Sequence, residues 1–397
     1  MGGDVIGQST EAYLLPRTGW NRFAVQDIPG GKTHARVRLG LRQIRHMWSV
    51  IDSSKFSPVN PANAERSARL ELPLARAGID RAGDLRVDAA KLDELWNSAR
   101  ILLVVREITT SQPTTSGPSK EIVTLKFATD GAGQPIFHSN SEILAQTSAL
   151  QISTGEKLFL GFDGTDSYFA YCSDAHHELP DTFRTLREIG DNLSDSDIGL
   201  AVHAQALANW HHTHTHCPRC GSTTTSTNGG SVRRCDADGS EHYPRTDPAI
   251  IVLVKDKNDR ILLGRQKVWP QNRFSNFAGF VDAGESFEHC VVREVGEEAG
   301  VRVSDIIYLG SQPWPFPASV MIAFHAITDN PEAARPDGEE IEEIRWYDRA
   351  TMKQDIASQN LLLPPAMSVA RKMIEAWYSA DGLSKDDLAG GESWRPN

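Results

Sequence analysis

The chain has 397 residues, of which 40% are hydrophobic and 23% are charged, and its formal net charge at pH 7 is −11. This is the composition of a globular protein, and at about 150 residues per domain the length predicts two or three domains. No run of about 18 apolar residues occurs, so a membrane partner is not expected, and the negative charge limits any nucleic-acid binding to a local basic patch.

Residues 1–193 are expected to form an N-terminal, mostly β domain with some helix. Short apolar runs between polar turns predict strands at Ile101–Val105, Ile122–Phe127 and Leu158–Phe162. Asp93–Ser98 falls in a predicted helix, and Thr109–Ser119 has the composition of an exposed loop. The region carries no visible catalytic motif, and the chain shows no internal repeat.

Residues 194–246 are expected to form a linker helix and a zinc-ribbon-like segment. Ser194 or Ser196 can cap a helix that runs to about residue 210, and the segment after it has too few apolar residues for a core of its own. Cys217, Cys220 and Cys235 provide the spacing of a zinc knuckle. The odd total of five cysteines does not resemble a disulfide framework and, without a secretory signal, indicates the cytoplasm.

Residues 247–380 carry the pattern that indicates chemistry. Strands are predicted at Ala249–Val254, Ile261–Arg265 and Met321–Phe324. Between the second and third of these, Gly279–Val301 reads GFVDAGESFEHCVVREVGEEAGV. We expect a helix in this segment that Ser286 begins and that a left-handed residue ends.

Three carboxylates, those of Glu294, Glu297 and Glu298, share one face of this predicted helix. Carboxylates placed so closely repel one another unless cations lie among them. Hard oxygen ligands suit Mg²⁺ or Mn²⁺, which can bridge pyrophosphate oxygens. A solvated acidic helix that binds no metal is the alternative interpretation.

The segment matches G-x5-E-x7-R-E-U-x-E-E-x-G-U, where U is aliphatic, at every fixed position, and so resembles the signature of the Nudix hydrolases. The resemblance implies a metal-dependent hydrolase with an α/β/α sandwich fold inside an α+β chain. We expect Glu285 and Arg293 to form a salt bridge that orients the acidic face. The structural positions of the signature are Gly279, Glu285, Arg293 and Gly300.

Ser311–Ser319 reads SQPWPFPAS and resembles the array of the NADH pyrophosphatase branch of these enzymes. Its prolines stiffen the segment, and the rings of Trp314 and Phe316 suit stacking on adenine or nicotinamide. A proline-aromatic turn packed in the core is the alternative. The resemblance implies substrate contacts at Tyr243, Phe280, Gln312, Pro313, Trp314, Pro315, Phe316, Pro317, Ala318, Ser319 and Ala370.

The resemblance also implies the metal sites. Catalysis and Mg²⁺ or Mn²⁺ binding are assigned to Glu294, Glu297, Glu298, Glu340 and, as a metal-binding position only, Ala278. The metal would neutralise the pyrophosphate and lower the pKa of an attacking water, with one carboxylate or a metal-bound hydroxide as the base.

The ribbon of the family has four cysteines, and Tyr243–Arg245 matches the YPR-like element that follows them. Counting back from Tyr243 places the fourth cysteine at Asp238. Asp238 is therefore the expected fourth ligand of a structural zinc held by Cys217, Cys220 and Cys235. His242, His216 or a metal-free segment are the alternatives.

The reaction implied for the chain is NADH + water → NMNH + AMP, with NAD⁺ as another substrate, in a cytoplasmic homodimer. Removal of the NAD cap from RNA 5′ ends and non-catalytic nucleotide sensing are the competing hypotheses. Residues 381–397 are acidic and Gly-rich and are expected to form a flexible tail.

Overall fold

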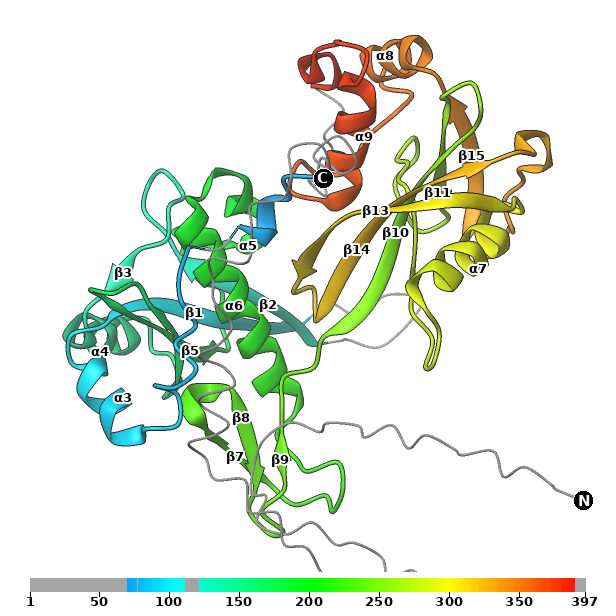
Figure 1. Ribbon diagram of the computed structural model, residues 1–397. Helices are drawn as coiled ribbons and strands as arrows, with labels where there is room; N and C mark the ends of the chain where they lie inside the picture. The colour runs from blue at the N-terminus through cyan, green and yellow to red at the C-terminus, as the bar shows by residue number, and fades with distance from the viewer. Residues whose placement is uncertain (1–69, 77, 111–120, 390–397) are drawn as a thin grey trace, which may run out of the picture. The chain divides into compact units, whose positions relative to one another are not determined.

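The computed structural model describes residues 70–110 except residue 77, and residues 121–389, and all of these belong to one compact unit, Ala64–Asn397. They form two six-stranded sheets and a three-stranded ribbon (Figure 1). Among the described residues, no helix is both long and apolar enough to cross a membrane.

The first sheet and the helices around it form the N-terminal domain. The sheet has the order β4-β5-β1-β2-β6, with β3 paired to β1. Its strands are β1 (Arg100–Thr110), β2 (Glu121–Ala128), β3 (Phe137–His138), β4 (Glu156–Phe162), β5 (Ser167–Ala175) and β6 (Phe183–Thr185). The helices are α3 (Ala89–Trp96), α4 (Asn140–Ala149), α5 (Leu186–Ile189) and α6 (Asp195–Thr213).

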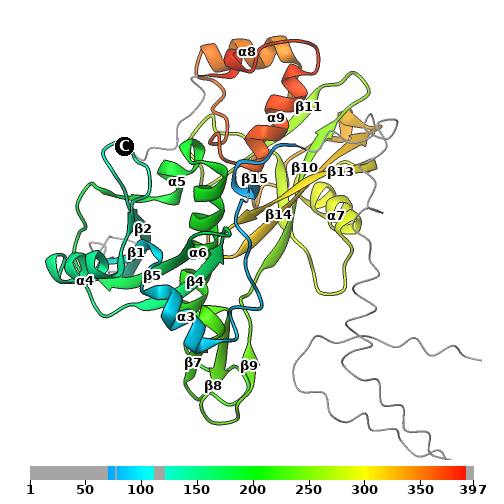
Figure 2. The same cartoon turned by 60° about the vertical axis from the view of Figure 1, so that its left-hand side comes forward.

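Strand β1 shows why this sheet is covered on both faces. Successive side chains of a strand point to opposite faces, and the apolar run predicted at Ile101–Val105 is buried throughout. Leu102 and Val104 pack with α6 on one face, whereas Ile101 and Leu103 pack with α3 on the other. Figure 2 shows both helices beside β5. The described part of the domain is therefore a sheet with helices on both faces, which agrees with the expected mostly β domain with some helix.

The second sheet has the order β13-β14-β10-β11-β15, with β12 paired to β10. Its strands are β10 (Asp247–Lys255), β11 (Ile261–Gln266), β12 (Phe277–Phe280), β13 (Val303–Trp314), β14 (Ser319–Thr328) and β15 (Ile341–Tyr347). Helix α7 (Phe287–Ala299) covers one face, and α8 (Arg349–Ala357) and α9 (Val369–Ser379) cover the other. These strands contain all three that the sequence predicts for this region.

The two sheets repeat one topology, although the sequence shows no internal repeat. In each sheet a long strand, β1 or β10, pairs in parallel with β5 or β14 and antiparallel with a short strand, β3 or β12. A helix, α4 or α7, follows each short strand. Strand order depends on the apolar pattern and the connections rather than on residue identity, which is why the repeat is not visible in the residues.

The ribbon consists of β7 (Thr224–Thr227), β8 (Val232–Cys235) and β9 (Glu241–His242), which pair antiparallel in that order. Helix α6 leads into it and is capped by Ser194, whose Oγ accepts a hydrogen bond from the Asp197 N–H at 3.1 Å. The ribbon packs on the N-terminal domain through buried His211, whose ring is 2.8 Å from the Gly230 carbonyl oxygen. This contact compensates for the small core of the ribbon.

The tail prediction is wrong for residues 381–389. Lys385–Leu388 forms a 3₁₀ turn in which Leu388 is fully buried against α8 and α9. Asp387 pairs with Lys353 at 2.9 Å, and Arg371 donates a hydrogen bond to the Leu388 carbonyl at 3.0 Å. One leucine in an acidic, Gly-rich stretch is enough to dock it, and composition alone conceals this.

Two further predictions fall partly outside the described residues. Thr109 and Thr110 of the expected loop close strand β1, and the rest of that loop is not described. The same holds for residues 1–69 of the expected N-terminal domain and for residues 390–397 of the expected tail.

Candidate active site and metal centres

Helix α7 begins and ends as the sequence predicts. Ser286 is its N-cap, with its Oγ accepting a hydrogen bond from the His289 N–H at 3.2 Å. Gly300 ends the helix at φ 69°, a left-handed conformation that a side chain disfavours. The caps fix where α7 begins and ends, and the helical spacing places Glu294, Glu297 and Glu298 on one face.

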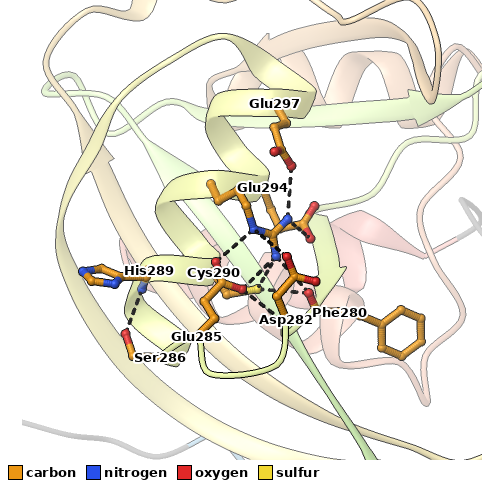
Figure 3. A network of polar contacts seen from close by, with 9 residues as sticks. Phe280, Asp282, Glu285, Ser286, His289, Cys290, Glu294 and Glu297 are labelled. Carbon is orange, nitrogen blue, oxygen red and sulfur yellow. Dashed lines mark hydrogen bonds and ion pairs between the residues drawn. The ribbon is translucent and has the colours of Figure 1, made fainter.

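Arg293 is the centre of a network of polar contacts on this face, and its partners Glu285, Glu294, Glu297 and Phe280 are labelled in Figure 3. Its guanidinium donates to both carboxylate oxygens of Glu285, at 2.9 and 2.8 Å, and to Glu294 at 2.8 Å and Glu297 at 3.1 Å. It also donates to the Phe280 carbonyl at 3.0 Å. The hydrogen bonds from Arg293 lower the pKa of Glu285 to about 2. The predicted Glu285–Arg293 salt bridge is confirmed, and it ties the loop before α7 to the acidic face.

Glu298 lies deeper, where the second sheet meets α7. Its side chain is only 4% exposed, and its Oε2 is buried without a hydrogen-bond partner among the described residues. Burial, followed by the nearby charges of Glu340, Glu294 and Asp337, raises the pKa of Glu298 to about 8, against a hydrogen bond from the Ala278 backbone. A buried oxygen aimed at a cluster of carboxylates is what a bound cation would satisfy.

Glu294, one turn earlier on α7, belongs to the same acid cluster. Burial raises its pKa, and although Arg293 opposes the shift, the charges of Glu297 and Glu340 reinforce it. Gly279 of β12 leaves the space for this carboxylate, because a Cβ at Gly279 would lie 1.9 Å from it. The structure thus explains the glycine of the signature by steric contact.

Glu340 and Asp337 come from the loop before β15. Glu340 accepts a hydrogen bond from Gln266 at 2.8 Å, and its charge acts on Glu294 and Glu298. Asp337 accepts hydrogen bonds from the backbone N–H groups of Glu339, Glu340 and Ile341. The sequence did not single out Asp337. Its place before a glycine and a run of glutamates was the one signal available, and such a place is typical of an ordinary turn.

Glu297 differs from the other glutamates of the signature. Its side chain is 61% exposed, and its contact is the ion pair with Arg293 at 3.1 Å. Figure 3 shows its carboxylate displaced along α7 from that of Glu294. The structure therefore brings together Glu294, Glu298 and Glu340, and leaves Glu297 at the rim.

In the ribbon, one possible ligand atom from each of four residues lies within 4.8 Å of the others, and the residues are Cys217, Cys220, Cys235 and Asp238. Two tight turns present them, with Gly221 N–H donating to the Cys217 carbonyl and Gly239 N–H to the Cys235 carbonyl. Although desolvation opposes it, hydrogen bonds from Ser240 and the Arg219 backbone lower the pKa of Cys217 to about 6. Hydrogen bonds from Ser240 lower that of Asp238 to about 2. The pKa of Cys235 is instead raised to about 11, because the backbone hydrogen bond from Asp238 is outweighed by desolvation and by the side chains of Asp238 and Cys220. Three thiols and a carboxylate gathered within ligand distance fit Zn²⁺, which binds cysteine as thiolate.

The segment Ser311–Ser319 forms the end of the β13–β14 hairpin. Gln312 is fully buried, accepting from the Leu74 N–H and donating to the Met367 carbonyl, each at 3.0 Å. Trp314 and Phe316 are half-buried against the core of the N-terminal domain. Pro315 is buried, Pro317 is exposed, and Pro313, Ala318 and Ser319 are intermediate.

The remaining expected substrate contacts differ in exposure. Phe280 and Tyr243 are 60% and 56% exposed, Phe280 at the end of β12 and Tyr243 directly after β9. Ala370, in the first turn of α9 behind its N-cap Ser368, is buried. The Tyr243 hydroxyl donates a hydrogen bond to Glu241 at 2.9 Å. Exposed aromatic rings suit stacking on a planar ligand.

Comparisons with known proteins agree with this geometry. A NADH pyrophosphatase-like rudimentary NUDIX domain matches residues 102–210, a NADH pyrophosphatase zinc ribbon domain residues 212–243, and a NUDIX domain residues 245–366. An NAD-capped RNA hydrolase NudC of Mycobacterium bovis is 41% identical over 215 residues, which cover 52% of this chain and 69% of that protein.

The chain belongs to the NudC-type NADH pyrophosphatase branch of the Nudix hydrolases. Two further relatives of this family are more distant. The mitochondrial NAD(P)H pyrophosphatase NUDT13 of Mus musculus is 38% identical over 225 residues, covering 53% of this chain and 64% of that protein. The NAD-capped RNA hydrolase NUDT12 of Macaca fascicularis is 34% identical over 197 residues, which cover 47% of this chain and 42% of that protein. The first sheet of this Nudix hydrolase is the rudimentary copy, and its helix α4 lacks the glutamates of α7.

Proposed function

We propose that this chain hydrolyses the pyrophosphate bond of NADH, and also of NAD⁺, to NMNH or NMN and AMP. The observation that carries the proposal is the acid cluster of Glu294, Glu298 and Glu340, in which one glutamate oxygen is buried without a partner. Carboxylates held this way stabilise a fold poorly and bind divalent cations well. Phe280 is tied to α7 by its carbonyl, which accepts a hydrogen bond from Arg293, and its ring is 60% exposed.

The residues proposed to hold Mg²⁺ or Mn²⁺ are Glu294, Glu298 and Glu340, with Glu297 at the rim and the backbone of Ala278 beside Glu298. The ions would neutralise pyrophosphate oxygens and supply an activated water. Arg293 keeps Glu294 oriented through its bond to Glu285. Asp337 orders the loop that carries Glu340 through three backbone hydrogen bonds.

On the substrate side we propose that Phe280 and Tyr243 stack on the bases and that Ser311–Ser319 lines the site. The exposure of the two rings supports this role. Because Trp314 and Phe316 pack against the N-terminal domain, they can contact the substrate only through the part of each ring that remains exposed.

Free dinucleotide and capped RNA are separated by one comparison. We expect AMP and NMNH from NADH in the presence of Mg²⁺ or Mn²⁺, and 5′-monophosphate RNA from NAD-capped RNA, each measured as kcat/KM at one ionic strength. A value for capped RNA far above that for NADH would make cap removal the main role. Absence of product from both substrates would exclude hydrolysis and leave nucleotide sensing.

A structural zinc in the ribbon is part of the proposal, with Asp238 as fourth ligand. Asp238→Ala is expected to lose most of the bound zinc and to lower the melting temperature, whereas Asp238→Cys keeps the zinc. Zinc content of the purified proteins, measured by atomic emission, checks this. Retention of zinc in Asp238→Ala with loss in His242→Ala would instead make His242 the ligand, since its Nε2 lies 3.2 Å from Ser240 Oγ beside the cluster.

We also propose a homodimer in a reducing compartment such as the cytoplasm. A pocket of ≈ 390 Å³ beside α7 is lined mainly by apolar side chains, those of Phe287, Tyr308, Val320, Ile322 and Phe324, with Glu288 and Ser311. Exposed apolar surface of this kind often marks an interface, and the five cysteines form no disulfide. Light scattering is expected to give twice the 43.7 kDa chain mass, and a monomer at micromolar concentration would contradict the dimer.

A further inference from the structure

The substrate segment Ser311–Ser319 is held from outside by the linker helix α6. Gln205 donates a hydrogen bond from Nε2 to the Pro315 carbonyl at 2.8 Å, and this bond is buried. Asn209, one turn further along the same face, donates from Nδ2 to the Pro315 and Pro317 carbonyls at 2.9 and 3.0 Å. Two side chains of one helix therefore fix two carbonyls of the segment.

The prolines explain why outside donors are required. Proline has no N–H, so a segment with proline at every second position offers few donors of its own. Within it, the Phe316 N–H bonds to the Trp314 carbonyl at 2.7 Å, and the Ala318 carbonyl accepts from Asp247 of β10 at 2.8 Å. The Pro315 carbonyl belongs to a buried residue, and a buried carbonyl left without a donor is costly. Helix α6 supplies that donor.

The aromatic rings of the segment are held by the same domain. Trp314 and Phe316 meet edge to face at 4.9 Å and pack against the core beneath α6. The guanidinium carbon of Arg187, from α5, lies 3.9 Å from the Phe316 ring centre and 5.2 Å from that of Trp314. Such cation–π contacts orient a ring as well as attract it.

We propose that Gln205 and Asn209 are positioning residues for the dinucleotide site, so that the rudimentary domain and its linker helix set substrate affinity while α7 sets turnover. The proposal rests on the proposed function of Ser311–Ser319 in substrate binding. It gives the N-terminal half of the chain a role in the reaction although the described residues of its helix α4 carry no set of glutamates like that of α7. If α6 only joined the domains, its contacts would affect folding and leave the affinity of folded protein unchanged.

The test is Asn209→Asp, which keeps the size of the side chain but replaces the donor by a carboxylate facing two carbonyl oxygens. We expect KM for NADH to rise about tenfold with kcat changed less than about twofold, because ground-state and transition-state binding weaken together. Asn209→Ala, which adds no charge, should give a smaller rise in KM. His212→Ala is the matched control, since His212 is an exposed residue of the same helix.

Hydrogen exchange of the peptide covering Ser311–Ser319 provides a readout that does not depend on activity. Its remaining amides are expected to exchange faster in Asn209→Asp than in wild type or His212→Ala. Unchanged KM with unchanged exchange, or a lower kcat at constant KM, would overturn the proposal. If wild type does not hydrolyse NADH, the proposed function fails by itself. Hydrogen exchange alone then tests whether α6 holds the segment. Equal exchange rates in Asn209→Asp and wild type would overturn that part of the proposal.

Discussion

Glu298→Gln is expected to lower kcat for NADH by about 1,000-fold or more while the protein remains folded. Glutamine keeps the shape of the side chain but removes the charge that a divalent ion requires at a buried ligand position. Steady-state kinetics at saturating Mg²⁺ or Mn²⁺ check the result. Glu297→Gln is the variant to compare with it. We expect a smaller loss of kcat in Glu297→Gln because the Glu297 carboxylate is largely exposed and pairs with Arg293. Comparable losses in both variants would contradict the separate placement of the two glutamates.

The same substitution is expected to stabilise the protein when Mg²⁺ and Mn²⁺ are absent. The pKa of Glu298 is raised from 4.5 to about 8 in the folded state. Its contribution to stability is therefore fully present below pH 4.5 and is lost as the pH rises through 8. Glutamine carries no such dependence, so the variant should gain about 4 kcal/mol over wild type at pH 8 and about 1 kcal/mol at pH 5.

Thermal melts at both pH values, with zinc retained and no added Mg²⁺ or Mn²⁺, measure this difference. Added Mg²⁺ or Mn²⁺ should reverse the order at pH 8 by stabilising wild type alone. A variant less stable than wild type at both pH values without metal would show that the ionised Glu298 carboxylate does not destabilise the folded protein.

Gly279→Ala is expected to reduce activity by about 100-fold with a change in stability below about 1 kcal/mol. The new methyl group would lie 1.9 Å from the Glu294 carboxyl carbon, so this carboxylate must move away from Glu298 and Glu340. The end of a side chain can shift with little effect on packing, which is why the loss should appear in turnover and metal affinity. Metal titrations of activity together with urea unfolding separate the two effects.

Gly296→Ala is the matched control on the adjoining helix, because a Cβ there meets no atom within 4 Å. Alanine favours a helix interior, so this variant should keep its activity and gain about 0.5–1 kcal/mol. Full activity in Gly279→Ala would contradict the steric account of the signature glycine.

The features that sequence predicts correctly here are local ones. Ser286, Gly300 and the Glu285–Arg293 pair depend on spacing within or next to one helix, and such spacing fixes geometry almost by itself. The cysteine spacing likewise predicted a cluster that the structure assembles, with Asp238 in the place of a cysteine.

The features that escaped prediction are non-local. The charge of Asp337, in the loop before β15, acts on Glu298 of α7 because β15 and α7 pack together, and a turn sequence does not reveal that packing. The anchoring of Trp314 and Phe316 depends on residues more than a hundred positions earlier in the chain. Stacking and core packing require the same residue types, so the motif alone does not distinguish them.

The most direct test of the proposed activity is the ³¹P NMR spectrum of NADH incubated with the wild-type protein and Mg²⁺ or Mn²⁺. We predict that the pyrophosphate signals disappear and that two phosphomonoester signals of equal area, those of AMP and NMNH, replace them. Pyrophosphate signals that persist, or release of nicotinamide with the pyrophosphate intact, would contradict hydrolysis between the two phosphates.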